Sequence, residues 1–265
     1  MRGWFSRDYE PVVTVAPGEP VTFHTYAAFW TWDADVEPER PEGAGHALYG
    51  PIEVRGARAG GTLAVRIDEV VPRDWGRTWA DGETFTWSLD GDTWRLGAHA
   101  VPSAPFLGVI GMPPPEPGEH RTTPPRRWGG NIDCKELVAG TTLYLPIPVD
   151  GALLMAGDGH GAQGDGEVSG TAIECPFERA TLTLDLDDRE LRSPIARTAR
   201  SWIAFGFDED LGAAAEQATE SMLDLMEREL GVPRAEARAL ASVSVDLHVT
   251  QVVNEVKGVH AILRA

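Results

Sequence analysis

The sequence is poor in positive charge. Its 265 residues carry 23 Lys and Arg against 41 Asp and Glu, which gives a formal net charge of −18 at pH 7. A nucleic-acid groove and a surface that binds anionic membranes both need an excess of cations, so this charge argues against both partners. It favours a small neutral or cationic partner, and it is compatible with a metal site.

Long apolar segments are also missing. No run approaches the roughly 20 apolar residues that a membrane-spanning helix needs, and the first residues, Met1 to Asp8, lack the apolar core of a signal peptide. Only two cysteines are present, Cys134 and Cys175, and we expect both to be free thiols in a reducing compartment. A cytoplasmic protein without a membrane segment is therefore expected.

Glycine and proline are abundant. The chain has 29 Gly and 20 Pro, which separate many short stretches rich in Val, Thr and Leu, as is typical of a turn-rich, mainly β protein. A helix is predicted over residues 209–230, where apolar side chains recur every three or four positions until Gly231. A shorter helix over 233–240 and two final strands over 244–253 and 258–263 complete the chain.

The chain is expected to form one structural unit with two parts. Residues 1–200 would be the β-rich part that carries the functional site, and residues 201–265 an α/β part packed on it. A loop is predicted over 33–45, which is acidic and rich in Pro and Gly. The segment 72–100 contains four tryptophans and predicts a hairpin that turns at 90–92, with the tryptophans used for packing or an interface.

The densest group of chemically active side chains lies in the run Gly157 to Glu167. Three carboxylates, one imidazole and one carboxamide occur there among glycines. Asp158 and His160 are two residues apart, as are Asp165 and Glu167, and in extended backbone such pairs point to the same face. Each pair could therefore aim two polar groups at one point. A solvated polar loop is the alternative interpretation.

Several motifs occur in one order along nearly the whole chain. They are His46, Gly50–Ile52, Pro105–Gly111, Gly129–Asp133, Gly140–Pro146, Gly157–Glu167, Gly170–Glu174, Thr250–Val253 and Gly258–His260. Together they resemble the acetamidase/formamidase family of amide hydrolases. The resemblance implies a mainly β fold, a jelly-roll or CUB-like β-sandwich with a smaller α/β part of C-terminal helices and strands. It also implies a homodimer or higher homo-oligomer that cleaves a short linear amide, such as formamide or acetamide, to a carboxylate and ammonia.

Amide hydrolysis needs a nucleophile, a group that stabilises the oxyanion, and an acid for the departing nitrogen. The sequence contains no Gly-x-Ser-x-Gly elbow. Cys134 followed by Lys135 and Glu136 suggests a thiol nucleophile, but adjacent residues point in different directions, and a buried structural thiol is the competing interpretation.

A metal-activated water fits the residues better. Zinc accepts His nitrogen and carboxylate oxygen as ligands and, in catalytic sites, keeps one position open for water. Asp133, Asp158, His160 and His46 are the candidate ligands of a divalent metal, with zinc expected and calcium as the alternative. A metal-free site that uses Asp, Glu and His for acid–base chemistry remains open.

The expected roles divide as follows. Glu167 is the candidate general base, at the start of a predicted strand, and His160 and Asp133 are further catalytic candidates. Asn131 and Gln163 could hold the substrate carboxamide, since each offers a donor and an acceptor. The alternative for Glu167 is a surface carboxylate, and for Asp133 a cap of a turn or helix start. For His160, Asn131 and Gln163 the alternative is a hydrogen bond that only stabilises a loop.

Two other functions remain compatible with the sequence. A β-sandwich protein could bind an amide or a metal without hydrolysing anything, and a metal could serve only to stabilise the fold. Four further titratable residues are expected to be structural, namely Glu174, Asp246, His248 and His260. Asp165 is expected to shape its turn.

Overall fold

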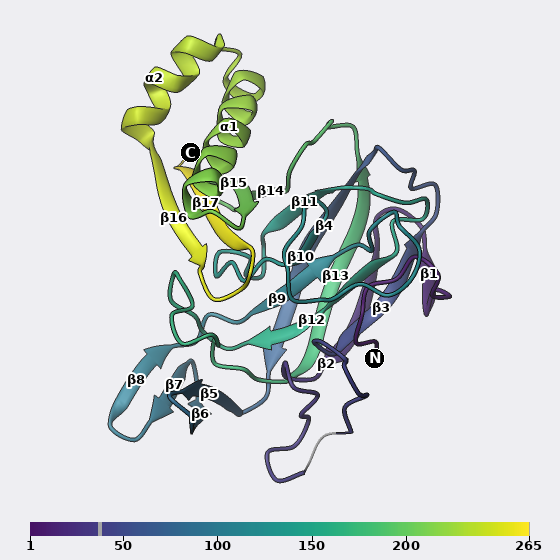
Figure 1. The fold of residues 1–265 in the computed structure, drawn as a ribbon, viewed down its shortest axis with the longest axis vertical. Coiled ribbons are helices and arrows are strands. Elements are labelled where there is room, and N and C mark those ends of the chain that lie inside the picture. Colours follow the sequence, from purple (N-terminus) through teal and green to yellow (C-terminus); the bar gives the residue numbers. More distant parts are fainter. Residues whose placement is uncertain (37–38, 265) are drawn as a thin grey trace.

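A computed structural model describes residues 1–36 and 39–264, and within these ranges the protein is mainly β. A five-stranded sheet has the order β1 (Val13–Val15), β3 (Leu48–Val54), β12 (Leu154–His160), β9 (Phe106–Gly111), β10 (Gly129–Asn131). An eight-stranded sheet has the order β16 (Val245–Gln251), β17 (Lys257–Arg264), β15 (Ser201–Asp208), β14 (Ile195–Arg197), β11 (Thr142–Pro146), β4 (Thr62–Pro72), β13 (Phe177–Asp187), β2 (Glu19–Thr25). Figure 1 shows both sheets at the centre of the molecule.

The two larger sheets share one apolar core. Strand β13 alternates buried and more exposed residues from Ala180 to Leu184, so one of its faces points inward. Leu182 of that face belongs to the same buried cluster as Ile110 and Leu154 of the five-stranded sheet. Burial of apolar side chains between two sheets is the driving force of a β-sandwich. The predicted mainly β fold is confirmed.

The tryptophan-rich segment forms a separate small sheet. Its strands are β5 (Trp75–Ala80), β6 (Glu83–Asp90), β7 (Thr93–Leu96) and β8 (His99–Pro102), in that order. The predicted hairpin is confirmed, because β6 and β7 are antiparallel and the turn falls at Gly91 and Asp92. Trp94 is fully buried against the main core, as expected for a packing residue.

Two helices lie at the C-terminal end of the chain. Helix α1 (Leu211–Leu230) begins after Asp210, whose side chain accepts a hydrogen bond from the Ala213 amide, and ends at Gly231 in the left-handed conformation. The predicted helix over 209–230 is thus confirmed. Helix α2 (Arg234–Ser244) continues four residues beyond the predicted end.

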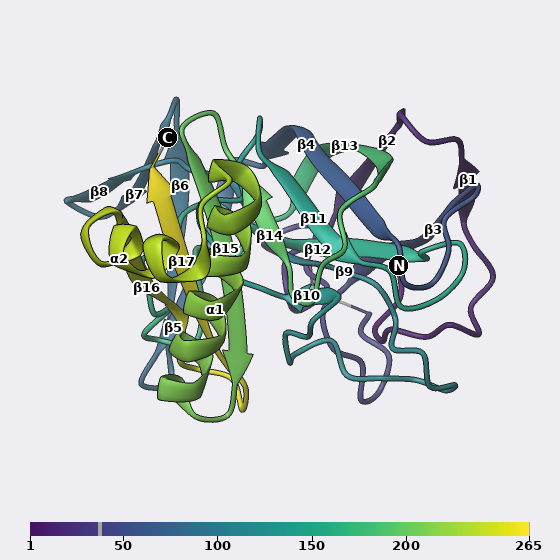
Figure 2. The same ribbon diagram turned by 90° about the horizontal axis from the view of Figure 1, so that it is seen from above.

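Helix α1 covers one end of the eight-stranded sheet (Figure 2). Its buried face, which includes Ala214, Ala218 and Met222, packs against β15 and β17. These strands continue the sheet that contains β11 and β4, so the C-terminal part extends the main sheet. The division after residue 200 stays a prediction. The predicted loop over 33–45 includes residues 37 and 38, which lie outside the described ranges.

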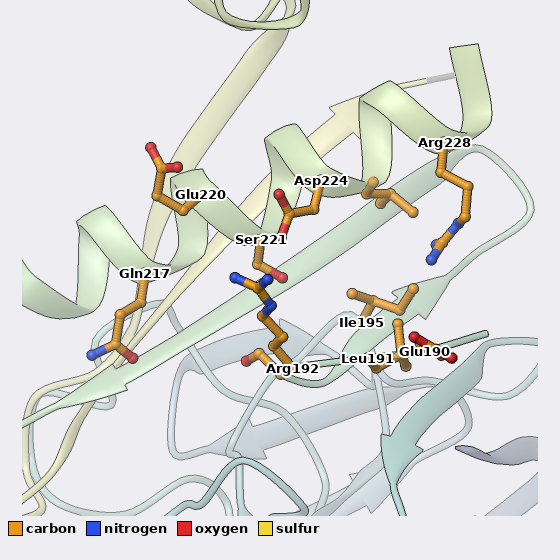
Figure 3. A pocket seen from close by; sticks show the side chains of 11 residues that line it. Glu190, Leu191, Arg192, Ile195, Gln217, Glu220, Ser221, Asp224 and Arg228 are labelled. Carbon is orange, nitrogen blue, oxygen red and sulfur yellow. The ribbon is translucent and has the colours of Figure 1, made fainter. Parts of the chain in front are cut away.

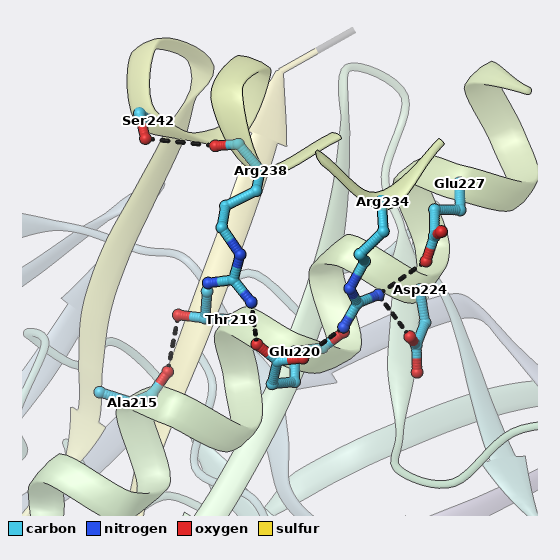
Figure 4. A network of polar contacts seen from close by, with 8 residues as sticks. All are labelled: Ala215, Thr219, Glu220, Asp224, Glu227, Arg234, Arg238 and Ser242. Atoms are coloured by element: carbon cyan, nitrogen blue, oxygen red, sulfur yellow. Dashed lines mark hydrogen bonds and ion pairs between the residues drawn. The ribbon is translucent and has the colours of Figure 1, made fainter. Parts of the chain in front are cut away.

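An ion-pair network ties α2 to α1 (Figure 4). The Arg234 guanidinium donates to Asp224 Oδ1 at 2.5 Å, to Glu227 Oε2 at 2.8 Å and to a Glu220 carboxylate oxygen. Arg238 donates to the other Glu220 oxygen at 2.6 Å. The three acidic side chains share one face of α1 because they are four and three residues apart. Arg234 therefore connects two turns of α1 to the start of α2.

Replacing Arg234 by Met should destabilise this helix pair. Networks of partly exposed ion pairs contribute on the order of 1 kcal/mol, so we expect the melting temperature to fall by roughly 2–4 °C in low salt. The loss should shrink in high salt, because salt screens the wild-type network. The control is Arg228→Met, since the one ion pair of Arg228 within the described residues is with its neighbour Glu229 on the same helix. Equal melting temperatures for the two variants at low salt would contradict the expectation.

Candidate functional site

The first part of the Gly157 to Glu167 run is a buried strand. Residues 157–160, the first four of its eleven residues, are the end of β12, which pairs with β9, so the alternative interpretation of a solvated loop does not hold for them. Its glycines permit close packing: a Cβ on Gly159 would lie 2.3 Å from the Cys175 carbonyl oxygen, and one on Gly161 would lie 2.4 Å from the Trp94 ring. A side chain at Gly159 or Gly161 would therefore clash with these neighbouring residues.

Asp158 and His160 point to the same side of β12, as their spacing predicts. Asp158 Oδ2 lies 3.3 Å from His160 Nε2. Glu174, on the segment that pairs with His160, places its Oε2 3.4 Å from the same nitrogen. All three side chains are almost completely buried. A single imidazole nitrogen therefore faces two carboxylates.

These residues border a small cavity of ≈ 60 Å³. Its polar lining comes from segments that are far apart in the sequence: His46, Asn131, Asp133, Asp158, His160, Glu167 and Glu174. Phe29 and Val253 also line it, and both are more than one-third exposed, so they mark its opening to solvent. The structure thus brings together every candidate from the sequence except Gln163.

Three of these carboxylates sit on unusual backbone. The φ angles of Asp133, Asp158 and Glu167 are 53°, 63° and 48°, in the left-handed region that non-glycine residues seldom adopt. Such conformations cost about 1–3 kcal/mol each and are concentrated at functional sites. Glu167 lies in a turn, where its amide donates to the Gly164 carbonyl, so the expectation that it begins a strand is wrong.

Gly108 on β9 lies directly against the side chains of Asp133, Asp158 and His160. A Cβ at this position would lie 2.6 Å from Asp158 Oδ2, 2.7 Å from Asp133 Oδ1 and 2.7 Å from His160 Cε1. Residues Gly129 to Asn131 form the short strand β10 beside β9. Asp133 follows two residues later, which places its carboxylate over Gly108.

Burial and mutual repulsion determine the charges of the site. Burial, followed by the negative charge of Glu167, raises the pKa of Asp133 well above its usual range. Burial raises the pKa of Glu167 to about 8 and that of Glu174 to about 7. Four carboxyl groups in one buried cluster cannot all ionise without a positive charge among them.

The neighbouring charges shift the pKa values of Asp158 and His160 in opposite directions. Burial opposes the charge of Asp158, but His46 and His160 outweigh it and lower the pKa of Asp158 to about 2. Burial likewise opposes a charged His160, yet the nearby Glu174 and Asp158 raise the pKa of His160 well above its usual value. These directions favour opposite charges on Asp158 and His160, whose Oδ2 and Nε2 atoms lie 3.3 Å apart.

The donor set fits a divalent cation. Both oxygens of Asp133, Oδ1 of Asp158 and Oε2 of Glu174 are buried and have no hydrogen-bond partner within residues 1–36 and 39–264. Ligand atoms of Asp133, Asp158 and His160 lie within 4.8 Å of one another, and so do those of His160, Glu167 and Glu174. Buried carboxylate oxygens without partners are costly unless a cation binds them.

Gln163 orients His160. Its Oε1 lies 3.1 Å from His160 Nδ1, and its Nε2 donates to the Asp133 carbonyl oxygen at 2.7 Å. Because an oxygen can only accept, His160 Nδ1 carries the hydrogen and Nε2 is directed to the carboxylates. Both ends of the carboxamide are occupied, which differs from the expectation that Gln163 holds substrate. Asn131 is buried with its Oδ1 unpartnered among the described residues and lines the cavity.

His46 lies at the edge of the group. Its Nδ1 is 2.9 Å from the Thr122 hydroxyl, and its Nε2 is 4.0 Å from Asp158 Oδ2. Burial lowers the pKa of His46, and the ring lines the cavity. Among the described residues, His46 belongs to none of the groups whose ligand atoms lie within 4.8 Å of one another.

One possibility raised by the sequence fails on geometry, and the alternative of a Cys134 nucleophile is disfavoured. Asp165 and Glu167 do not converge, because Asp165 Oδ2 lies 2.9 Å from both Lys135 Nζ and His248 Nδ1, whereas Glu167 faces the cavity. Cys134 is fully buried, and burial together with the charge of Glu136 raises the pKa of its thiol well above the usual value. A thiolate nucleophile is therefore disfavoured at this position.

Sequence reasoning missed Glu174 and Gly108. Glu174 was expected to be structural, yet it lies in the cavity beside His160. Its sequence context offers a signal, because it is an isolated carboxylate in the apolar run Ala172 to Phe177. Gly108 has no such signal, since its role depends on which strand pairs with β12.

Other cavities lie away from this chemistry. A cavity of ≈ 300 Å³ between α1 and residues 190–195 is shown in Figure 3. Its polar lining, including Arg192, Asp224 and Arg228, contains no member of the buried carboxylate group. Separately, no described helix is both long and apolar enough to cross a membrane.

Comparisons with known proteins find relatives of this chain in one family. A model of the Acetamidase/Formamidase family matches residues 116–192, which include Asp133, Asp158, His160 and Glu167. An acetamidase structure from Bacillus halodurans is similar over 98% of this chain and 94% of that chain, with 30% identity and a TM-score of 0.90. A structure of a predicted acetamidase/formamidase from the thermophile Thermoanaerobacter tengcongensis is similar over 98% and 92% of the two chains, with 26% identity and a TM-score of 0.90.

A curated relative matches over a shorter stretch. The acetamidase of Mycolicibacterium smegmatis is 49% identical over 49 residues, which span 18% of this chain and 12% of that protein. The sequence identity is thus high over a short stretch, whereas the structural similarity covers 98% of this chain.

Proposed function

Because this chain belongs to the acetamidase/formamidase family, we propose that it hydrolyses a short linear amide to a carboxylate and ammonia. The observation that carries the proposal is the buried group of four carboxylates around His160 at a small cavity open to solvent. Burial of so many charges is costly. Binding of a neutral amide does not require such a group, whereas hydrolysis requires proton transfer and charge stabilisation.

We propose that Asp133, Asp158 and His160 hold a divalent cation, with Glu174 as a further ligand and His46 at the edge. Zinc suits a set of imidazole and carboxylate donors, and calcium is the alternative for a carboxylate-rich site. When bound, the cation supplies Lewis acidity and makes water more acidic at neutral pH. The unpartnered oxygens of Asp133, Asp158 and Glu174 support this assignment.

Glu167 is the proposed general base. Its raised pKa of about 8 lies near neutral pH, which suits a group that takes a proton from water and then gives it to the departing nitrogen. We propose that Asn131 accepts a hydrogen bond from the substrate NH₂ group, which its unpartnered Oδ1 at the cavity supports. Gln163 positions His160 so that its Nε2 faces the cavity.

The small cavity predicts a preference for small substrates. Its volume of ≈ 60 Å³ and the Phe29 and Val253 side chains at its opening leave little space for a long acyl group. We further propose that the protein is cytoplasmic, which the two free thiols support. We also propose that it is a homo-oligomer. The edge strand β16 exposes Leu247, and the preceding helix exposes Val243, so this edge could serve as an interface.

Ammonia release tests the proposal directly. The zinc-loaded protein should release ammonia from formamide and acetamide, with rates that fall as the acyl chain lengthens. Chelation should abolish the release, and added zinc should restore it. A protein that binds acetamide by calorimetry but releases no ammonia from any amide when loaded with zinc or calcium would be a binding module, and the proposed hydrolase activity would be wrong.

A further inference from the structure

A second group of potential metal ligands lies outside the cavity. Cys134 Sγ is 3.2 Å from Glu136 Oε2, which is 3.3 Å from His260 Nε2. The three ligand atoms lie within 4.8 Å of one another. Cys134 and Glu136 follow β10, while His260 is on β17, so the group joins the segment that carries Asp133 to the C-terminal part of the sheet.

The surroundings orient His260 toward this group. The Thr250 hydroxyl lies 2.8 Å from His260 Nδ1, and the His248 ring stacks on His260 at 5.1 Å between centroids. These contacts fix the ring so that Nε2 faces Cys134 and Glu136. His260 is fully buried, and its Nε2 makes no hydrogen bond of good geometry with any described residue. A buried imidazole nitrogen in this position is a ready ligand.

We propose that Cys134, Glu136 and His260 bind a second divalent transition metal of the zinc class. Thiolate, imidazole and carboxylate are all zinc ligands, and the sulfur disfavours magnesium and calcium. Binding replaces the proton of the Cys134 thiol, which is released to water past Glu136, whose side chain is 20% exposed. The metal then neutralises the thiolate and the Glu136 carboxylate.

The second site is separate from the catalytic cavity. None of its three residues lines that cavity, although Cys134 is the direct neighbour of Asp133. Glu136 borders a different hollow of ≈ 630 Å³ next to Trp87 and Val101, which gives an ion a path from solvent. By joining β17 to the segment after β10, the metal would hold Asp133 in place, so its role is structural support of the catalytic site.

Cobalt(II) titration distinguishes the two sites, because only a cobalt–thiolate bond gives an intense charge-transfer band in the near ultraviolet. The chain has two cysteines, so Cys175→Ser is the matched control for Cys134→Ser. We expect the band in the wild type, in Cys175→Ser and in Asp158→Asn, and its loss in Cys134→Ser. Elemental analysis should find one zinc fewer per chain in Cys134→Ser than in the wild type.

A second variant tests the site even if Cys134→Ser does not fold. Glu136→Gln alters the least buried ligand and should weaken cobalt binding at this site at least about tenfold while circular dichroism stays unchanged. The proposal of a second site would be overturned by a wild type without the band. It would also be overturned by a Cys134→Ser protein with the same band and zinc content as the wild type. The readout does not involve ammonia release, so its failure is distinguishable from failure of the proposed hydrolase function.

Discussion

The Glu167→Gln variant is expected to bind substrate and metal but to lose turnover. Gln has nearly the shape of Glu but cannot accept and return a proton, and general acid–base groups contribute roughly 10²–10⁴-fold to a rate. The loss should appear in kcat, with KM for acetamide little changed. Steady-state ammonia release at saturating acetamide measures the effect, and zinc content and the melting temperature show whether the site remains intact.

The Glu167 result is interpreted against two controls. Glu178 is an exposed carboxylate on β13 outside the cavity, so Glu178→Gln should keep wild-type turnover. Removing one of the mutually repelling carboxylates should also leave the protein no less stable, because the raised pKa of Glu167 shows that its charge is unfavourable where it lies. A Glu167→Gln protein with full kcat would remove Glu167 as the base, and Glu174 would be the next candidate.

Local pattern was sufficient to predict several elements of the fold. The helix over 209–230 has an N-cap, a regular apolar face and a glycine stop, all encoded within a few residues. The hairpin around Gly91 and the same-face pair Asp158 and His160 also depend only on neighbours in the chain. These predictions are correct because the features depend on local sequence and not on tertiary contacts.

The expectations that failed depend on contacts between distant segments. The Gly157–His160 stretch resembles a loop in composition, yet pairing with β9 makes it a strand whose glycines fit under Cys175 and Trp94. Asp165 and Glu167 share the correct spacing, but the turn at Glu167 directs the two side chains to different sites. Glu174 joins the cavity only through its bridge to His160.

The candidate site was therefore predictable in its residue types more than in its geometry. Asp133, Asp158, His160 and Glu167 were identified from polar residues in glycine-rich motifs, and the structure places all four around one cavity. Gln163 was assigned to the substrate because a carboxamide can pair with an amide, but the same donor and acceptor hold His160 and the Asp133 carbonyl. Composition cannot distinguish these two uses.

Gly108→Ala should disable the site through a single added methyl group. The φ angle of Gly108 is not in the left-handed region, so alanine is compatible with the backbone of β9, and the effect must come from contact. The new Cβ would lie 2.6–2.7 Å from atoms of Asp158, Asp133 and His160, closer than real Cβ contacts allow. All three side chains are buried and have little room to move.

The expected result is a loss of metal and of turnover with a smaller loss of stability. A displacement of about 1 Å in a catalytic group can cost roughly 100-fold in rate, so we expect kcat/KM for acetamide to fall by at least that factor and zinc affinity to fall with it. Gly164→Ala is the matched control, because a Cβ there meets nothing within 4 Å although it lies in the same motif as His160. If Gly108→Ala retained wild-type zinc content and kcat/KM, the convergence of Asp133, Asp158 and His160 over β9 could not be the arrangement that binds metal and substrate.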